Sequence, residues 1–512
     1  MNIKRAKEEI KNTVKAYLLK DEFNEYVIPT VRQRPILLMG APGIGKTAIM
    51  EQIAGECRIG LVSYSITHHT RQSAVGLPFI SKKNYGGKEY SVTEYTMSEI
   101  IASVYNKIQE TGFKEGILFI DEVNCVSETL APMMLQFLQS KTFGTHKVPE
   151  GWIIVTAGNP PEYNKSVRDF DVVTLDRMKV INVEPDFESW KEYAWKKGIH
   201  GAVLSYLEIK KNNFYIMENT VDGRRFVTAR GWEDISTVIK VYEKLGIKTD
   251  EHFVYQYLQH KKTAKDFANY IELYNKYRTD YNVSEILNGK FNDVSIKKIE
   301  NAPFDEKLSV LGLLLSSLSD KFREAFVADL HTERLYTILK ELKEKFTSPY
   351  CKDTYFKDIM DTVIDDEKAV FEHKRNTNLI DKTESKGYNR TIESLENYCN
   401  EAVKKGITDK EEVFEFIKQK FALVVKNRED VIENSSNALN NAFEFIEKAF
   451  GTGQEMVIFI TELTANYYSV KFISENGCEK YYNYNKDLLF DEKQKSIIND
   501  IKNAKTEIDL LF

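Results

Sequence analysis

The chain has 512 residues with a net charge of -6 at pH 7, and 42% of its residues are hydrophobic. This length is more than one hydrophobic core usually holds, so two or more domains are expected. The negative charge argues against a protein that coats nucleic acid, and no apolar run reaches the ~18 residues of a membrane span. The five cysteines are scattered without a CxxC pair, which predicts reduced thiols and a cytoplasmic protein.

Residues 1–29 begin the chain with a helical pattern. Ile10, Val14 and Leu18 recur on one face among charged residues, without the apolar core of a signal peptide. We expect an N-terminal helix that ends near Asp21.

A phosphate-binding loop is predicted next. The apolar run 36–39 indicates a short strand, and residues 48–54 follow with helical periodicity. The pattern GxxxxGK[ST] between a strand and a helix surrounds an anion with backbone N–H groups, and Lys46 adds a mobile positive charge. The alternative is a simple Gly/Pro turn. The residues of the expected nucleotide site are Gly40, Ala41, Pro42, Gly43, Ile44, Gly45, Lys46, Thr47 and Ala48.

Two insertions have the pattern of β-hairpins. In residues 71–95, alternating segments flank the turn Gly86-Gly87, and residues 141–151 are similarly bounded by turn-forming residues. A second strand is expected at 59–66 and a helix at 100–110.

An acid pair follows a buried strand. Residues 117–120 are apolar, and Asp121 and Glu122 come directly after them, at the carboxyl edge of the expected parallel sheet. A magnesium–nucleotide site needs one carboxylate for the metal shell and a second to polarise the attacking water. The alternative is that the two acids merely open a solvated loop.

Another apolar strand, expected at 152–158, ends in Asn159 before two prolines. This amide either faces the nucleotide or forms an Asx turn.

The order of these elements resembles the AAA+ ATPases, with Leu175-Asp176-Arg177 and Thr228-Ala229-Arg230 as further points of likeness. Within AAA+, the chain looks most like the MoxR-type family. That likeness rests on Gly76-Leu77-Pro78, on Pro149-Glu150-Gly151-Trp152 before Asn159-Pro160, and on the segment 183–190. It covers about residues 30–280 and implies an α/β P-loop NTPase with a parallel sheet core at 30–185 and a helical lid at 186–278.

The resemblance implies ATP and Mg²⁺ as cofactors. By likeness, Lys46 contacts the β and γ phosphates, and Thr47 and Asp121 hold the metal. Glu122 is then the general base for water, and Asn159 senses the γ phosphate. Arg177 becomes the finger that enters the neighbouring subunit's site.

Arg230 is implied as a lid arginine that returns to the same nucleotide. It follows Thr228, a good N-cap, so it lies in the first turn of a helix, where a cation opposes the helix dipole unless it pairs with an anion. Arg168 competes with Arg177 as the finger, and Arg224 and Arg225 compete with Arg230 as the lid arginine. A local ion pair with Asp176 is the alternative for Arg177.

Residues 279–512 are predicted to be mainly helical, and they contain no catalytic constellation. Two apolar stripes have helical spacing, one over 335–346 and one over 439–450, and a capping box predicts a helix at 413–425. The polar stretch 373–390 is the expected linker.

The sequence thus predicts an ATP-hydrolysing homo-oligomer, a hexameric ring by likeness, that remodels a protein client in a chaperone-like way. The resemblance also implies a partner with a von Willebrand factor A-type domain. One alternative is a DNA-associated motor, whose phosphate contacts would be lysines of the two insertions: Lys82, Lys83, Lys88, Lys141 and Lys147. Another is a nucleotide-switched scaffold with little turnover.

Overall fold

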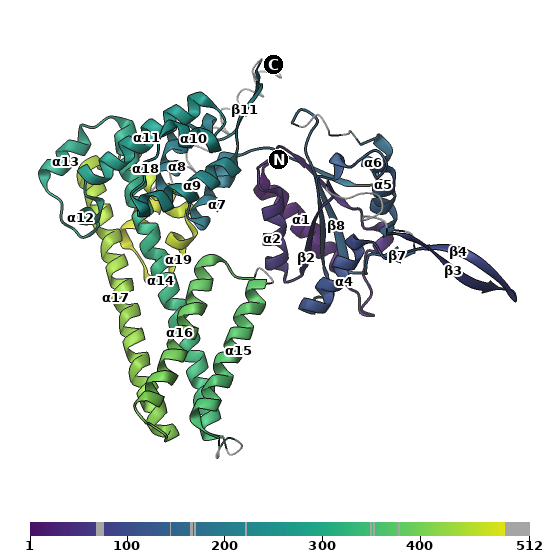
Figure 1. Ribbon diagram of the computed structural model, residues 1–512. Coiled ribbons are helices and arrows are strands. Elements are labelled where there is room, and N and C mark those ends of the chain that lie inside the picture. The colour runs from purple at the N-terminus through teal and green to yellow at the C-terminus, as the bar shows by residue number, and fades with distance from the viewer. Residues whose placement is uncertain are drawn as a thin grey trace, which may run out of the picture. The chain divides into compact units, whose positions relative to one another are not determined.

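The computed structural model describes residues 1–67, 76–143, 145–163, 167, 170–220, 223–348, 351, 354–376 and 379–486 (Figure 1). The chain forms two compact units. The first contains Met1–Trp190, Thr228–Arg230 and Ala369–Asp381, and the second contains Lys191–Val227, Gly231–Lys368 and Lys382–Phe512.

A five-stranded parallel sheet organises the first unit, in the order β2-β5-β8-β1-β9. β8 is buried along its whole length, because helices cover both faces of the sheet. α4 and α5 pack on one face around Phe137 and Ile154, while α1 and α2 lie on the other side (Figure 1). The strands are β1 (Ile36–Gly40), β2 (Gly60–Ser65), β5 (Gly116–Asp121), β8 (Trp152–Gly158) and β9 (Lys179–Val183). The helices are α1 (Ile3–Leu18), α2 (Lys46–Cys57), α4 (Glu99–Thr111), α5 (Ala131–Ser140) and α6 (Val172–Asp176).

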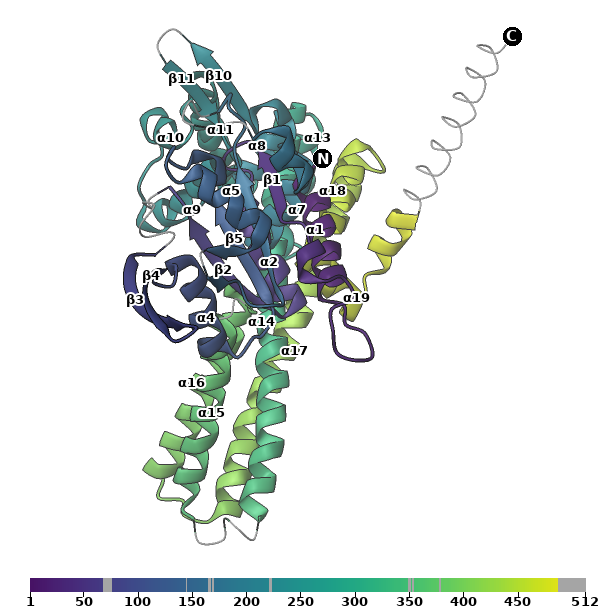
Figure 2. The same cartoon turned by 90° about the vertical axis from the view of Figure 1, so that its right-hand side faces the viewer.

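Both predicted hairpins are present. β3 (Pro78–Tyr85) and β4 (Lys88–Tyr95) form an antiparallel pair that projects from the sheet (Figures 1 and 2), and β6 (Thr142–Phe143) pairs with β7 (His146–Lys147). The first hairpin exposes large apolar side chains, including Ile80 and Tyr85. Two of its lysines are paired, since Lys82 lies 3.4 Å from Glu89 and Lys83 forms an ion pair with Glu94.

The lid region is helical except for one hairpin that the sequence analysis missed. β10 (Ile216–Thr220) and β11 (Gly223–Val227) form an antiparallel pair between its helices. Those helices are α7 (Phe187–Lys197), α8 (Gly201–Ile209), α9 (Ala229–Leu245), α10 (Glu251–Tyr257) and α11 (Lys261–Asp280).

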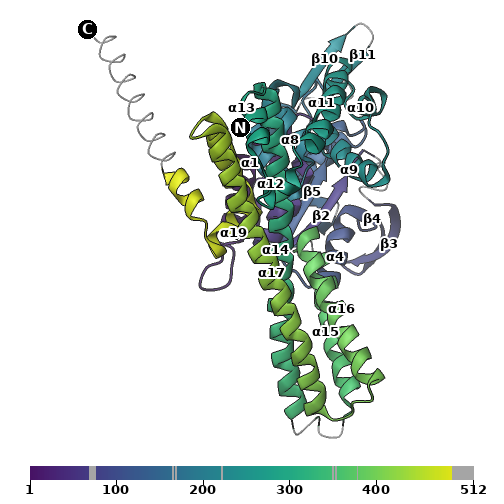
Figure 3. The ribbon, with the colours of Figure 1, turned by 90° about the vertical axis from the view of Figure 1, so that its left-hand side faces the viewer.

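Long helices dominate the C-terminal region, and α14 and α17 run alongside each other (Figure 3). The two segments predicted at 413–425 and 439–450 are one continuous helix, α17. α14 also packs closely on α8, and the absence of a side chain at Gly312 permits this. A Cβ added at Gly312 would lie only 2.8 Å from the Ser205 Cβ. The elements are α12 (Val283–Leu287), α13 (Asp293–Glu300), α14 (Phe304–Thr347), α15 (Phe356–Asn376), α16 (Lys382–Lys404), α17 (Lys410–Phe450), α18 (Gln454–Ala465) and α19 (Tyr467–Asn476).

The polar stretch 373–390, expected as a linker, is mostly helical, because residues 373–376 belong to α15 and residues 382–390 to α16. The stretch has few apolar residues, but Tyr388 is buried, and the Arg334 guanidinium stacks on its ring at 4.0 Å. Arg334 also makes a bidentate ion pair with Glu367 of α15. Arg334 of α14 thus contacts both α15 and α16, and these contacts take the place of the apolar stripe that the sequence lacks there.

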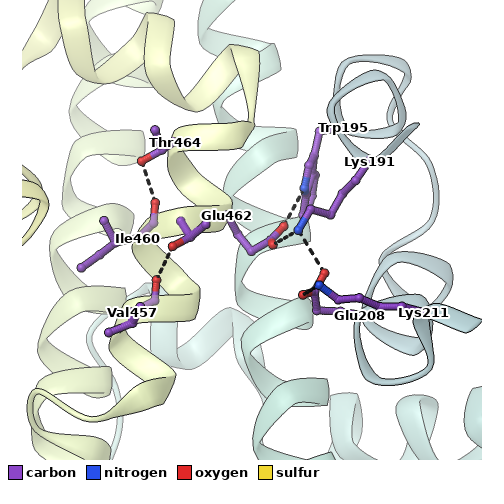
Figure 4. Close-up of polar contacts among 9 residues, drawn as sticks. Lys191, Trp195, Glu208, Lys211, Val457, Ile460, Glu462 and Thr464 are labelled. Carbon is purple, nitrogen blue, oxygen red and sulfur yellow. Dashed lines mark hydrogen bonds and ion pairs between the residues drawn. The ribbon is translucent and has the colours of Figure 1, made fainter. Parts of the chain in front are cut away.

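A buried ionic cluster joins α18 to α7 and α8 (Figure 4). The Lys191 ammonium lies 2.7 Å from a Glu462 oxygen and 3.0 Å from a Glu208 oxygen. Trp195 Nε1 donates to the other Glu462 oxygen at 2.8 Å. Burial lowers the pKa of Lys191, but the two carboxylates outweigh burial and hold its pKa above the ordinary value. The lid helices and the C-terminal region therefore share one packed body.

Among the residues that the structure describes, no helix combines the length and the apolar character needed to cross a bilayer.

Candidate active site

The phosphate-binding loop connects β1 to α2 with the backbone that its glycines were expected to provide. Gly43 and Gly45 have φ of 73° and 93°, in the left-handed region that favours glycine. A Cβ on Gly40 would lie 2.7 Å from the Val183 carbonyl oxygen, so glycine is also required there by close packing. A Cβ on Gly45 would meet nothing within 4 Å, so glycine is required there by its backbone conformation and not by packing.

Lys46 is 8% exposed and lies at the first position of α2. Its Nζ donates to the carbonyl oxygens of Gly40 and Ala41 at 2.7 and 2.9 Å, and to Asn159 Oδ1 at 2.8 Å. Burial lowers the pKa of Lys46 to about 8, with the Asp121 carboxylate acting in the opposite direction. The lysine is therefore a buried cation held by oxygen atoms at the mouth of the loop.

Thr47 and Asp121 bring two oxygen ligands together. Thr47 Oγ1 donates to Asp121 Oδ2 at 3.1 Å, although the residues lie 74 positions apart. Two adjacent ligands in an octahedral magnesium shell, each about 2.1 Å from the metal, lie about 3 Å apart. This donor pair thus fits Mg²⁺.

Glu122 follows at the turn into the short 3-10 helix Val123–Cys125. Its φ of 57° is in the left-handed region, which is uncommon for a residue with a side chain. Its N–H donates to Asp121 Oδ1 at 2.9 Å. Backbone strain of this kind is characteristic of functional sites.

Asn124 is a site residue that the sequence analysis did not single out. It is 2% exposed, and its Nδ2 donates to the backbone oxygen of Asn159 at 2.8 Å. The sequence feature that could have identified Asn124 is its amide, three positions after Asp121, among the otherwise apolar residues of 123–126. Asn159 is thus held through its backbone by Asn124 and through its side chain by Lys46.

Arg177 caps the C-terminus of α6 and is exposed. Its guanidinium donates to Gln139 of α5. No ion pair with Asp176 is present among the described residues. Lys179 pairs with Ile36 and Val183 with Gly40, so Arg177 lies at the edge of the sheet where β1 begins, and the phosphate loop leaves the opposite edge. The competing residue, Arg168, lies outside the described residues.

Arg230 lies in the first turn of α9, and Thr228 precedes that helix, as predicted. Its N–H donates to the Gly43 carbonyl oxygen at 3.3 Å, and its charge contributes to the lowered pKa of Lys46. Arg230 therefore lies beside the phosphate loop within the first unit. Arg224 and Arg225 lie on β11, in the second unit.

Comparison with known proteins gives one family match. Residues 36–174 match the ATPase family associated with various cellular activities, abbreviated AAA. A solved structure of a candidate ATPase from Cytophaga hutchinsonii is 18% identical over 37% of this chain, with a TM-score of 0.23. The match spans 55% of that protein. No curated protein matches this chain.

The matched segment contains the phosphate loop, the acid pair and Asn159. Residues 36–174 thus form an AAA-family ATPase domain on a parallel sheet, and a mainly helical region follows it.

Proposed function

We propose that the chain is a MoxR-type AAA+ ATPase that couples ATP hydrolysis to the remodelling of a protein client. The observation that carries this proposal is the meeting of two pairs of side chains at the carboxyl edge of one sheet, beside Glu122. There, Thr47 contacts Asp121 at 3.1 Å, Lys46 contacts Asn159 at 2.8 Å, and Glu122 follows directly.

The chemistry is attack of water on the γ phosphorus of ATP, with cleavage of the bond to the β–γ bridging oxygen. Lys46 binds the phosphates, and Thr47 and Asp121 hold Mg²⁺, which neutralises charge when bound. The Glu122 carboxylate accepts the proton of the attacking water, while the Asn159 amide orients that water. ADP and inorganic phosphate leave, and Glu122 returns the proton.

A ring is proposed because Arg177 is remote from its own phosphate loop. The register from Lys179 to Val183 spans four residues, about 13 Å at the usual strand rise. Arg177 lies two residues further away and is exposed, which favours a role in a neighbouring copy. The resemblance to MoxR-type proteins suggests six copies and a partner with a von Willebrand factor A-type domain. The scattered cysteines favour the cytoplasm.

The β3–β4 hairpin is the proposed client contact. It exposes Phe79, Ile80, Tyr85 and Tyr90, and such a surface suits apolar polypeptide. The alternative of a DNA motor needs exposed, unpaired lysines, but Lys82 and Lys83 are each paired with a carboxylate and Lys141 is buried. The exposed apolar side chains of the hairpin and the loss of these three lysines as phosphate contacts therefore favour a protein client over DNA.

The test is Glu122→Gln, with steady-state phosphate release and equilibrium ATP binding measured on the same sample. ATP binding should persist, while turnover should fall at least tenfold, because a general base contributes about 10²–10⁴ in rate. Glu110→Gln is the matched control, because Glu110 is an exposed acid on α4. An unchanged rate in Glu122→Gln would refute the assignment of the base, and negligible turnover by the wild-type protein would favour the switched scaffold.

A further inference from the structure

Asn124 is held in a position that packing alone does not explain. Its side chain is 2% exposed, and among the described residues its Oδ1 has no hydrogen-bond partner. That oxygen faces Gly158, where an added Cβ would lie 2.7 Å away. Leaving a buried amide oxygen unsatisfied costs stability, and an apolar side chain of the same shape would avoid the cost. An apolar side chain could not, however, donate the 2.8 Å hydrogen bond that Asn124 Nδ2 makes to the Asn159 backbone oxygen.

This bond joins the two turns that carry the reacting groups. Asn124 lies two residues after Glu122, in the short 3-10 helix that follows β5, and Asn159 follows β8, the neighbouring strand. In the proposed reaction Glu122 and Asn159 act on one water molecule, so their separation has to be fixed. The left-handed backbone of Glu122 makes its turn costly to hold, and the partly buried hydrogen bond from Asn124 to the residue after β8 restrains it.

We propose that Asn124 is a positioning residue that fixes Asn159 relative to Glu122 and thereby aligns the attacking water. This inference rests on the proposed ATPase function. Asn124 touches neither ATP nor water in this role, because it acts through the Asn159 backbone. It therefore affects the rate of hydrolysis and leaves ATP affinity intact.

The decisive variant is Asn124→Leu, which keeps the side-chain shape and removes both the hydrogen bond and the unsatisfied oxygen. A purely structural role predicts a protein of lower stability with normal turnover per folded molecule. The positioning role predicts a kcat per folded molecule about tenfold lower and an ATP Kd within twofold of wild type, whatever the change in Tm. Asn427→Leu, at an exposed position of α17, is the matched control.

A double-mutant cycle with Asn159→Ala separates action through Asn159 from independent action. In the Asn159→Ala background, Asn124→Leu should cause no further loss of kcat. A wild-type kcat in Asn124→Leu, or an equal loss in both backgrounds, would overturn the inference. If the leucine variant fails to fold, Asn124→Ala replaces it in the same cycle. Glu122→Gln is measured in parallel. Normal turnover in Glu122→Gln refutes the proposed function. Slow turnover in Glu122→Gln together with normal turnover in Asn124→Leu refutes only the positioning role.

Discussion

Lys46 Nζ donates a 2.8 Å hydrogen bond to Asn159 Oδ1, across 113 positions of sequence. The bond connects the phosphate loop to the end of β8. The lysine proposed to bind phosphate and the amide proposed to orient water are therefore in direct contact with each other. A substitution of either residue should therefore change the position of the other side chain.

Replacing Lys46 by Met should weaken ATP binding at least tenfold, because a charged hydrogen bond to phosphate is worth about 1.5–3 kcal/mol. Stability should be kept or increased, because burial already lowers the pKa of this lysine to about 8. Titration with a fluorescent nucleotide and thermal unfolding measure the two effects. Lys141→Met is the control, since Lys141 is also buried, its Nζ donates to the Thr30 carbonyl oxygen, and burial lowers its pKa to about 8 as well. Equal ATP affinity in the two variants would contradict the phosphate role of Lys46.

Arg177→Ala and Lys46→Ala should each abolish turnover alone, and their mixture should recover activity. A working site needs an intact Lys46 in one copy and an intact Arg177 in its neighbour, so random mixing at equal amounts restores about one quarter of the sites. Steady-state phosphate release over a range of mixing ratios checks this. Arg32→Ala, at an exposed position in the same unit, should remain fully active. If no ratio restores activity, Arg177 acts within its own chain or no ring forms.

Glu462→Leu should destabilise the second unit by about 3 kcal/mol, because it leaves Lys191 buried with only Glu208 beside it. Adding Lys191→Met should recover most of that loss, since an apolar pair replaces the buried charges. Urea unfolding followed by tryptophan fluorescence reports on the cluster, because Trp195 donates to Glu462. A double variant no more stable than Glu462→Leu would show that packing, and not charge pairing, sets the cost.

Acid should weaken the protein through His331, which lies on α14 and contacts Ser394 Oγ at 3.1 Å. Burial lowers the pKa of His331 to about 4, from 6.5, and the Arg390 charge adds to this. The unfolded chain therefore binds a proton before the folded one, and stability falls as pH drops from 6.5 towards 4. The loss between pH 7 and pH 5 should be about 1 kcal/mol, after allowance for solvent screening of a partly exposed ring.

His331→Asn removes this titration, so its urea midpoint should fall less between pH 7 and pH 5 than that of the wild-type protein. Identical pH dependence in the two proteins would exclude His331 as the cause.

Local sequence patterns predicted the phosphate loop, the acid turn and both hairpins of the first unit, because glycines, turns and strand ends leave signals within a few residues. β9 was missed because Lys179 and Asn182 interrupt its apolar residues. Asn124 and the Lys191–Glu462 pair were missed for a different reason: their partners lie 35 and 271 positions away. A buried polar group is recognisable only when the fold brings its partner to it.

Helix α14 begins in the core shared with α8 and continues as one 44-residue rod to Thr347. At the usual rise it is about 66 Å long, so a rotation of 5° at its base moves its far end by about 6 Å. Near its N-terminus, Gly312 lets α14 pack directly against Ser205 of the lid helix α8. Such close packing allows little movement of α14 relative to the lid. A rotation of the lid by a few degrees, carried by α14 as a rigid helix, would therefore move Thr347 by several ångström.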